Sequence, residues 1–242
     1  MSITEKYEAA VAELPVSGIQ PMTTIDFPGR IAAVIFTPGC PWACRYCHNP
    51  GLRNGGGAEL LPHEKVSAFL RDRRLFLDGI VLSGGEPTMH RGIVNFMRRL
   101  RELGYDTGIH TNGYEPGVLK HLLRKHLLDF VALDIKAPPV AYDRITDCPG
   151  SGAAVGSSLR ELLASGVGYE CRTTYHPDLL SEEELSDTMH AVHNAGVRTY
   201  HIQRFRDNGV EDEGLLLNGR SVEIPSGIVE EGSRMFEVFS VR

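Results

Sequence analysis

The chain has 242 residues, of which 31 are acidic and 25 are basic, so its formal net charge is -6 at neutral pH. This balance offers no extended positive surface to nucleic acid or to anionic lipid, and we expect binding to neither. Residues 1–10 lack a basic start followed by an apolar run, and no stretch reaches the ~18 to 20 apolar residues of a membrane span. We therefore expect a soluble, cytoplasmic protein.

In chain order, the first predicted element is a helix at residues 5–14. Apolar runs typical of buried parallel strands then alternate with segments in which apolar residues recur three and four positions apart, as they do in helices. The six predicted strands lie at residues 31–37, 79–83, 105–110, 130–135, 168–174 and 198–203. A shorter strand-like piece follows at residues 235–241.

The predicted helices have recognisable ends. Pro62 and Pro116 lie where first helical turns are expected, a position that suits the fixed backbone angle of proline. Ser181 and Glu184 have the spacing of a capping box, and Gly196 suits a helix end. The glycine run at residues 55–57 and the segment at residues 149–156 are expected to be loops.

Strands that alternate with helices indicate an α/β fold with a parallel sheet. Six units in place of eight indicate a partial, open TIM-type barrel of about six βα units. We expect a single domain over residues 1–242, with its core at about residues 18–203, an N-terminal helical extension at residues 1–17 and a C-terminal tail at residues 204–242.

Three of the five cysteines, Cys40, Cys44 and Cys47, lie in a loop directly after the first of the six β-type runs. Three close thiolates favour a soft metal site, and cysteines crowded into one loop suit a reducing compartment. An iron-sulfur cluster normally has four cysteine ligands. A fourth is missing here, so one iron of a [4Fe-4S] cluster would stay open to another ligand.

The residues alone leave other metal sites and other ligand sets open. Zinc bound by the three cysteines and His48 is the competing metal site, although Cys47 and His48 are chain neighbours and would face one ion only with difficulty. Cys148 and Cys171 could complete a ligand set, but isolated cysteines are more often small buried hydrophobic residues.

Several motifs together resemble the radical S-adenosylmethionine superfamily. They are the C-x₃-C-x₂-C loop, S-G-G-E-P-T at residues 83–88, H-T-N-G at residues 110–113 and D-I-K at residues 134–136. With T-I-D-F-P-G at residues 24–29 and Y-C-H-N-P at residues 46–50, the chain is similar to activating proteins of anaerobic ribonucleoside-triphosphate reductase, within the glycyl-radical-enzyme activases. Each motif lies at the C-terminal end of a predicted strand, where barrel enzymes build their active sites.

The resemblance implies a [4Fe-4S] cluster on Cys40, Cys44 and Cys47, with S-adenosyl-L-methionine bound at the open iron and cleaved to a 5′-deoxyadenosyl radical. Glu86 is expected to accept hydrogen bonds from the cofactor's ammonium group, and Gly84 and Gly85 to let the backbone approach it. The remaining expected cofactor contacts are Tyr46, Thr111, Asn112, Asp134, Lys136, Arg172 and Gln203, the last two suggested mainly by side-chain chemistry.

One residue departs from the pattern of formate-lyase activases, which have Asp before T-N-G as part of a monovalent-cation site. Here the residue is His110, and an imidazole is a poor ligand for a hard alkali ion. We therefore expect any such site to differ. His48 and Asn49 are expected to fix the cluster loop, and Asp26 either to face the partner or to cap a turn.

The leading prediction is an enzyme that places a glycyl radical on a partner, most directly anaerobic ribonucleotide reductase, with flavodoxin or ferredoxin as the electron donor. A pyruvate formate-lyase activase is the nearest alternative. A radical enzyme acting on a small molecule is a further alternative. A non-enzymatic metal-binding or redox-sensing module would be of a different class.

Overall fold

The structure is a computed structural model that describes residues 14–53 and 59–242. In this part of the chain, a single sheet contains strands in chain order: β1 (Gly18–Thr23), β2 (Ala32–Thr37), β3 (Gly79–Gly84), β4 (Asp106–Thr111), β5 (Phe130–Asp134), β6 (Gly168–Tyr175), β7 (Thr199–Arg204) and β8 (Val238–Val241). Strand β1 runs antiparallel to β2, and all later neighbours are parallel.

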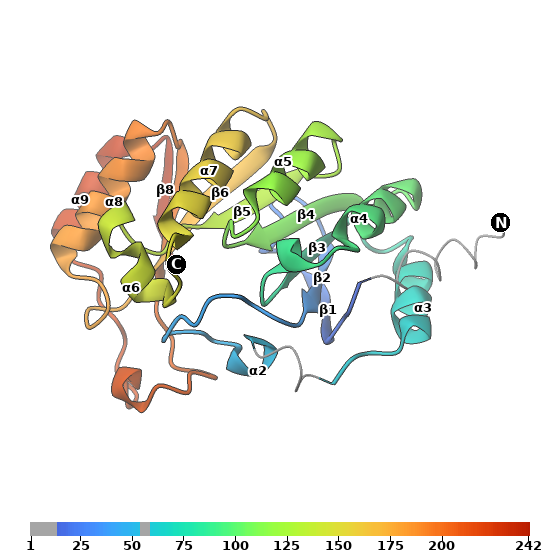
Figure 1. The fold of residues 1–242 in the computed structure, drawn as a ribbon, viewed down its shortest axis with the longest axis horizontal. Coiled ribbons are helices and arrows are strands. Elements are labelled where there is room, and N and C mark those ends of the chain that lie inside the picture. Colours follow the sequence, from blue (N-terminus) through green and yellow to red (C-terminus); the bar gives the residue numbers. More distant parts are fainter. Residues whose placement is uncertain (1–13, 54–58) are drawn as a thin grey trace.

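Helices connect successive strands and cover one face of the sheet (Figure 1). They are α2 (Pro50–Arg53), α3 (His63–Arg73), α4 (Ile93–Glu102), α5 (Pro116–Arg124), α6 (Tyr142–Thr146), α7 (Ser151–Leu163), α8 (Glu182–Asn194) and α9 (Ser226–Met235), with short 3₁₀ turns at Pro87–Met89, Pro139–Ala141 and Glu213–Leu215. The predicted capping box is confirmed, because Ser181 and Glu184 exchange hydrogen bonds of 2.9 and 3.1 Å at the start of α8. None of the helices described is long and apolar enough to cross a membrane.

The predicted α/β class and open parallel barrel are confirmed, since β1 and β8 remain separate edges in the described residues. The sheet nevertheless has more strands than predicted. Strand β1 contains Pro21 and exposes Gln20, Pro21 and Met22, as an edge strand can, and its residues do not form a continuous apolar run. Strand β8 has four residues, lies within the strand-like piece predicted at residues 235–241, and pairs with β7, so the sheet extends beyond the core expected to end near residue 203. The single-domain assignment stays a prediction.

Two other expectations concern loops and the N-terminus. The loop predicted at residues 149–156 is wrong from Ser151 onward, where α7 begins after Gly150, whose φ is +81°. Gly152 lets α7 pack closely, because a Cβ there would lie 3.1 Å from the Cβ of Tyr142. The predicted helix at residues 5–14, except its last residue, and the glycine run at residues 55–57 lie outside the described part of the chain.

The interior of the barrel has an apolar half and a charged half. In the first half, Phe27 stacks on Phe130 with ring centroids 5.6 Å apart. The two rings belong to a buried cluster on the inner sides of the early strands, which also contains Ala32, Val34, Val81 and Ala132. Across β6 to β8 the inward positions are polar, and they are occupied by Glu170, Arg172, His201 and Ser240.

Candidate functional site

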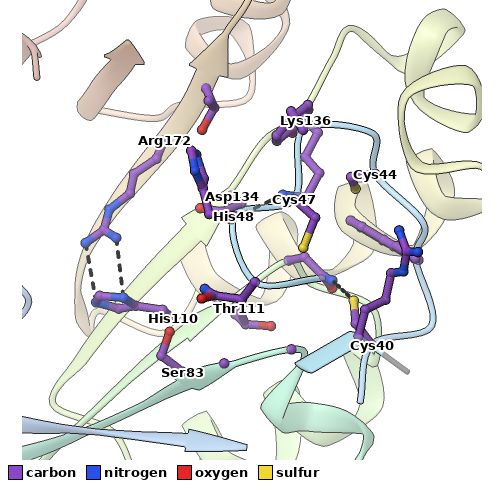
Figure 2. Close-up of a pocket in the computed structure, with 18 of the residues that line it drawn as sticks. Cys40, Cys44, Cys47, His48, Ser83, His110, Thr111, Asp134, Lys136 and Arg172 are labelled. Atoms are coloured by element: carbon purple, nitrogen blue, oxygen red, sulfur yellow. Dashed lines mark hydrogen bonds and ion pairs between the residues drawn. The ribbon is translucent and has the colours of Figure 1, made fainter. Parts of the chain in front are cut away.

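A cavity of about 240 Å³ lies at the C-terminal ends of the parallel strands, the face where barrel enzymes place their active sites. Figure 2 shows it between the loop after β2 and the ends of the later strands. The structure brings all but one of the residues predicted for the site to this cavity: Cys40, Cys44, Tyr46, Cys47, Gly84, Gly85, Thr111, Asn112, Asp134, Lys136, Arg172 and Gln203.

The three cysteines line one wall of the cavity as free thiols. Burial raises the pKa of Cys40 to about 12 and also raises that of Cys44, so binding a metal cluster must displace protons from both. The Nδ2 of Asn112 donates to the Sγ of Cys40 at 3.6 Å. Hydrogen bonds to ligand sulfurs are one of the means by which proteins tune iron-sulfur potentials.

The position of His48 bears on the choice between a cluster and a single zinc ion. A single zinc ion holds its thiolates about 4 Å from one another. Among the described residues, no group of three or more His, Cys, Asp or Glu side chains is placed to hold a metal ion. His48 instead has Nδ1 3.4 Å from the carbonyl oxygen of Asn208. The contact of His48 with Asn208 therefore does not support a Cys₃His zinc site.

Two buried polar atoms beside these thiols indicate that the cavity receives a ligand. The Nε1 of Trp42 and the hydroxyl of Tyr46 have no hydrogen-bond partner in the described part of the chain. Both side chains line the cavity. Buried donors without partners are rare because each costs about 1–3 kcal/mol, so they fit a site that a polar cofactor completes.

Close packing of the backbone explains why the S-G-G-E motif contains two glycines. A Cβ on Gly84, whose φ is +115°, would lie 2.3 Å from the carbonyl oxygen of Thr37, and one on Gly85 would lie 1.9 Å from that of Gly39. Both glycines thus let the end of β3 pack against the start of the cysteine loop. Their contact with a cofactor stays a prediction.

Glu86 is the predicted site residue that does not line the cavity. It is fully buried, and its Oε1 accepts hydrogen bonds from the Thr88 amide at 2.9 Å and the Thr111 hydroxyl at 2.7 Å. Its Oε2 accepts from the Asn112 amide at 2.8 Å. Burial raises the pKa of Glu86, and these donors oppose the rise. In the structure, the carboxylate therefore fixes the ends of β3 and β4 relative to each other.

The D-x-K segment after β5 supplies charge beside the cysteine loop. The Nζ of Lys136 lies 3.3 Å from Oδ2 of Asp134 and 5.4 Å from the centre of the Tyr46 ring. Burial disfavours a charge on Lys136, but its interactions with Tyr46 and Asp134 outweigh that cost and raise its pKa well above the usual value. A protonated ammonium thus faces the cavity and suits a carboxylate ligand.

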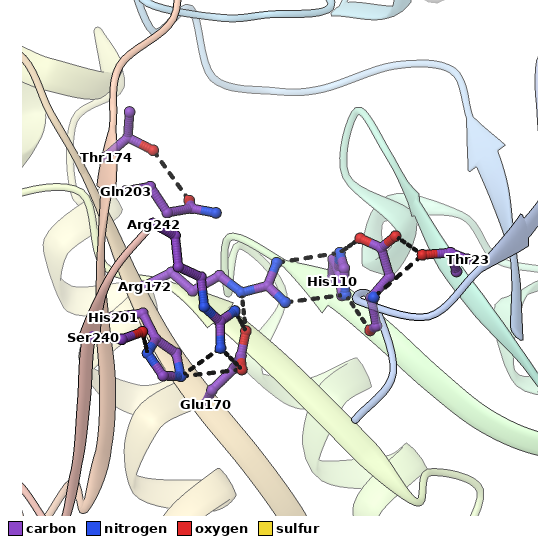
Figure 3. A network of polar contacts seen from close by, with 10 residues as sticks. Thr23, His110, Glu170, Arg172, Thr174, His201, Gln203, Ser240 and Arg242 are labelled. Carbon is purple, nitrogen blue, oxygen red and sulfur yellow. Dashed lines mark hydrogen bonds and ion pairs between the residues drawn. The ribbon is translucent and has the colours of Figure 1, made fainter. Parts of the chain in front are cut away.

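His110 and Arg172 form a contact between β4 and β6 (Figure 3). The Nε2 of His110 lies 2.9 Å from the carbonyl oxygen of Asp26. Because a carbonyl oxygen only accepts hydrogen bonds, we assign the imidazole proton to Nε2. Burial and the Arg172 guanidinium lower the pKa of His110 to about 4. A neutral imidazole therefore lies where the resemblance led us to expect an altered cation site, and that expectation stays a prediction.

Arg172 is held from below by a buried carboxylate. The Nε of Arg172 pairs with Glu170, which also accepts from Nη1 of Arg242 at 3.0 Å. His201 Nε2 lies 3.3 Å from the same carboxylate. Burial would raise the pKa of Glu170, but hydrogen bonding to His201 and the charge of Arg172 hold it well below its usual range. This network connects β6, β7 and the end of the chain beneath the cavity.

The structure also places the other residues for which the sequence suggested a role. Asn49 lines the cavity, and Asp26 accepts a 2.5 Å hydrogen bond from Thr23 while also lining a neighbouring cavity. Cys171 is fully buried in the core and Cys148 packs partly buried against it, so neither lies at the cavity. Sequence reasoning missed cavity residues such as Trp42, Arg53, Ser83 and Thr174. These residues lie near the cysteine motif or at strand ends, and that position was the signal that could have identified them.

Comparison with known proteins shows the family of this chain. A family model described as the Radical SAM superfamily matches residues 34–193. A Methanocaldococcus jannaschii protein, MJ1227, assigned as a glycyl-radical enzyme activating enzyme, is 34% identical over 207 residues, covering 82% of each chain. The pyruvate formate-lyase-activating enzyme of Streptococcus mutans is 34% identical over 223 residues, covering 81% of each chain.

The fold has relatives among solved structures. QueE from Escherichia coli superposes with a TM-score of 0.55 at 13% identity, over 100% of this chain and 98% of that one, a likeness that shows the fold alone. From the family model and the sequence relatives, the chain belongs to the radical S-adenosylmethionine superfamily, in its family of glycyl-radical enzyme activating enzymes. Membership implies a [4Fe-4S] cluster and S-adenosylmethionine as cofactors.

Proposed function

We propose that this protein installs a glycyl radical on anaerobic ribonucleoside-triphosphate reductase. The observation that carries this is the convergence of three free thiols with the T-N-G and D-x-K strand ends on one cavity that continues into a wider opening. When bound, the cluster and S-adenosylmethionine together supply a 5′-deoxyadenosyl radical. The chain's own residues bind and orient these groups and admit the partner's glycine.

The proposed roles follow from the chemistry of each wall. Cys40, Cys44 and Cys47 hold the cluster. Lys136, paired with Asp134, and Arg172, paired with Glu170, both line the cavity and present positive charge to the cofactor's carboxylate. The unpartnered polar atoms of Trp42 and Tyr46, together with Asn112, offer hydrogen bonds, while the backbone ends at Gly84 and Gly85 allow close approach. We assign Glu86 to positioning rather than to cofactor contact.

The choice of partner rests on the sequence. The T-I-D-F-P-G segment and the Y-C-H-N-P closure of the cysteine loop resemble ribonucleotide reductase activators. Phe27 of the first segment stacks on Phe130, and Asp26 lines the cavity that adjoins the cofactor cavity. Five free thiols suit the reducing cytoplasm and a flavodoxin or ferredoxin donor.

The experiment is anaerobic incubation of the cluster-loaded protein with S-adenosylmethionine, dithionite and purified reductase, followed by electron paramagnetic resonance. We expect a doublet that collapses to a singlet when the reductase carries glycine deuterated at its α-carbon. Parallel samples contain pyruvate formate-lyase. A doublet on the lyase alone would assign the alternative partner, and cofactor cleavage with neither doublet would favour a small-molecule substrate.

A further inference from the structure

The segment that follows β7, residues 205–215, lies against the cysteine loop, and we call it the strap. It begins at Phe205, which is 2% exposed and whose amide donates to the carbonyl oxygen of Tyr175 at 3.2 Å. It ends at Leu215, which is 1% exposed and belongs to the hydrophobic core. Both ends of the strap are therefore anchored in the barrel, and the residues between them contact the loop.

The closest contact joins the strap to the residue that follows Cys47. Gly209 has a φ of +81°, and a Cβ there would lie 2.4 Å from the carbonyl oxygen of His48. The Nδ1 of His48 lies 3.4 Å from the carbonyl oxygen of Asn208, and the His48 and Phe205 ring centroids are 5.7 Å apart. Because this approach leaves no room for a side chain, glycine lets the strap fix the backbone next to a cysteine.

An ion pair connects the strap to the loop on the other side of Cys47. Arg45, which lies between Cys44 and Cys47 in the chain, has its Nε 2.6 Å from Oδ2 of Asp212. The other oxygen of Asp212 accepts from the amide of Gly214 at 3.0 Å, so the carboxylate is held within the strap. The arginine is 55% exposed, and the contribution of the pair is accordingly small.

A cavity of about 280 Å³ lies beside the strap and the cysteine loop. Cys44 and Cys47 line this outer cavity as well as the cofactor cavity. Its lining also includes Glu211 and Asp212 of the strap. The same two thiols therefore border both spaces, and a cluster that they bind is separated from the outer cavity only by the loop and the strap.

We propose that the strap holds the cysteine loop in its cluster-binding shape and slows the loss of the cluster through the outer cavity. Gly209 and Asp212 are the positioning residues, and they act on Cys47 through His48 and Arg45. Groups that orient metal ligands from behind contribute to metal affinity in this way. The inference goes beyond the choice of partner, because it concerns the cluster that family membership implies.

The test measures how fast the cluster-loaded chain loses iron to bathophenanthroline disulfonate without oxygen, and it compares Gly209→Ala with Gly219→Ala. The two glycines have φ values of +81° and +82°, so alanine is strained equally at both, but a Cβ at Gly219 meets nothing within 4 Å. We expect Gly209→Ala to release iron about tenfold faster than Gly219→Ala, as for other changes behind metal ligands.

Two further measurements separate positioning from a general effect on folding. Urea titration of the cluster-free proteins should give the two alanine variants similar midpoints, while electron paramagnetic resonance of the reduced cluster should change only in Gly209→Ala. Asp212→Asn keeps an oxygen for the amide of Gly214 but loses the ion pair. It should release iron about two to three times faster than the wild type, as suits an exposed pair.

The outcomes also separate the strap from the proposed function. Equal iron release by Gly209→Ala and Gly219→Ala would overturn the proposal, because backbone strain alone would then explain both. Should neither alanine variant fold, a wild-type rate in Asp212→Asn would overturn it instead. Faster release by Gly209→Ala, without any glycyl radical on the reductase, would leave the strap standing and reject the proposed partner.

Discussion

The two halves of the barrel interior differ in what they bury. Strands β2 to β5 place Ala32, Val34, Val81 and Ala132 inward, with the Phe27 and Phe130 rings among them. Strands β6 and β7 place Glu170, Arg172 and His201 inward, at 2–8% exposure. Burying apolar surface stabilises a fold directly, whereas buried charges contribute only when they are fully paired.

This difference separates stability from site geometry. Among the described residues, the members of the apolar half are absent from the lining of the cofactor cavity. The charged half holds Arg172 at the cavity through Glu170, at an energetic cost that an apolar core would avoid. We infer that the first half maintains the fold and that the second is retained for the placement of positive charge beside the cofactor.

The largest expected effect lies outside both halves, in the cysteine loop. Cys40→Ala, Cys44→Ala or Cys47→Ala should each abolish binding of a stable cluster, because a cluster held by two thiolates loses a covalent ligand. Cys171→Ala should still bind the cluster, since that thiol is buried in the hydrophobic core and does not line the cavity. Iron and sulfide content and visible absorption after anaerobic reconstitution measure this. A Cys171→Ala protein without cluster would contradict the assignment.

In the apolar half, Phe130→Ala should lower the free energy of unfolding by about 3–5 kcal/mol, because it leaves a cavity beside Phe27. Urea titration of the cluster-free protein gives this value. If the apolar half does not shape the site, the folded variant, once loaded with cluster, should bind S-adenosylmethionine as tightly as the wild type. A tenfold loss of cofactor affinity would show that the two halves are not separable in this way.

In the charged half, Glu170→Gln removes the carboxylate shared by Arg172, Arg242 and His201. Two buried or partly buried positive charges lose their partner, so we expect a loss of about 2–4 kcal/mol. Cofactor affinity should fall as well, as judged by equilibrium dialysis of S-adenosylmethionine. The matched control is Glu237→Gln, whose pair with Arg198 is 66–72% exposed and should contribute under about 1 kcal/mol.

The smallest effect concerns pH. Burial and Arg172 lower the pKa of His110 to about 4, below the value of about 6.5 expected in the unfolded chain. The unfolded state therefore binds the proton first, and stability falls as the pH drops from about 6.5 toward 4. Relative to His110→Gln, the wild type should lose about 1–3 kcal/mol across that window. His121→Gln, an exposed change on α5, should run parallel to the wild type.

Much of this architecture can be predicted from the sequence, because the early strands are continuous apolar runs. Strands β6 and β7 are less distinct because their inward residues, Glu170, Arg172 and His201, are charged or polar. Those same residues turn out to build the charged half. The interruption of an apolar run was therefore a signal of function as well as a source of ambiguity.

Most residues predicted for the site lie at one cavity because strand-end motifs converge in any parallel barrel, while their contact with a cofactor stays a prediction. Glu86 is the exception, since nothing in the sequence shows that Thr88, Thr111 and Asn112 occupy both of its oxygens. Arg242 could not be predicted either. Its role depends on β8, a four-residue strand, lying beside β7 and on its contact with Glu170.

The most direct test of the central claim, that this cavity cleaves its cofactor for use on a partner's glycine, follows deuterium. Reductase prepared with α-deuterated glycine is incubated with the reconstituted protein, S-adenosylmethionine and dithionite, and the 5′-deoxyadenosine is analysed by mass spectrometry. We predict deuterium in that product, in step with the glycyl radical formed. Cofactor cleavage without deuterium transfer, or no cleavage by cluster-loaded protein, would contradict the account.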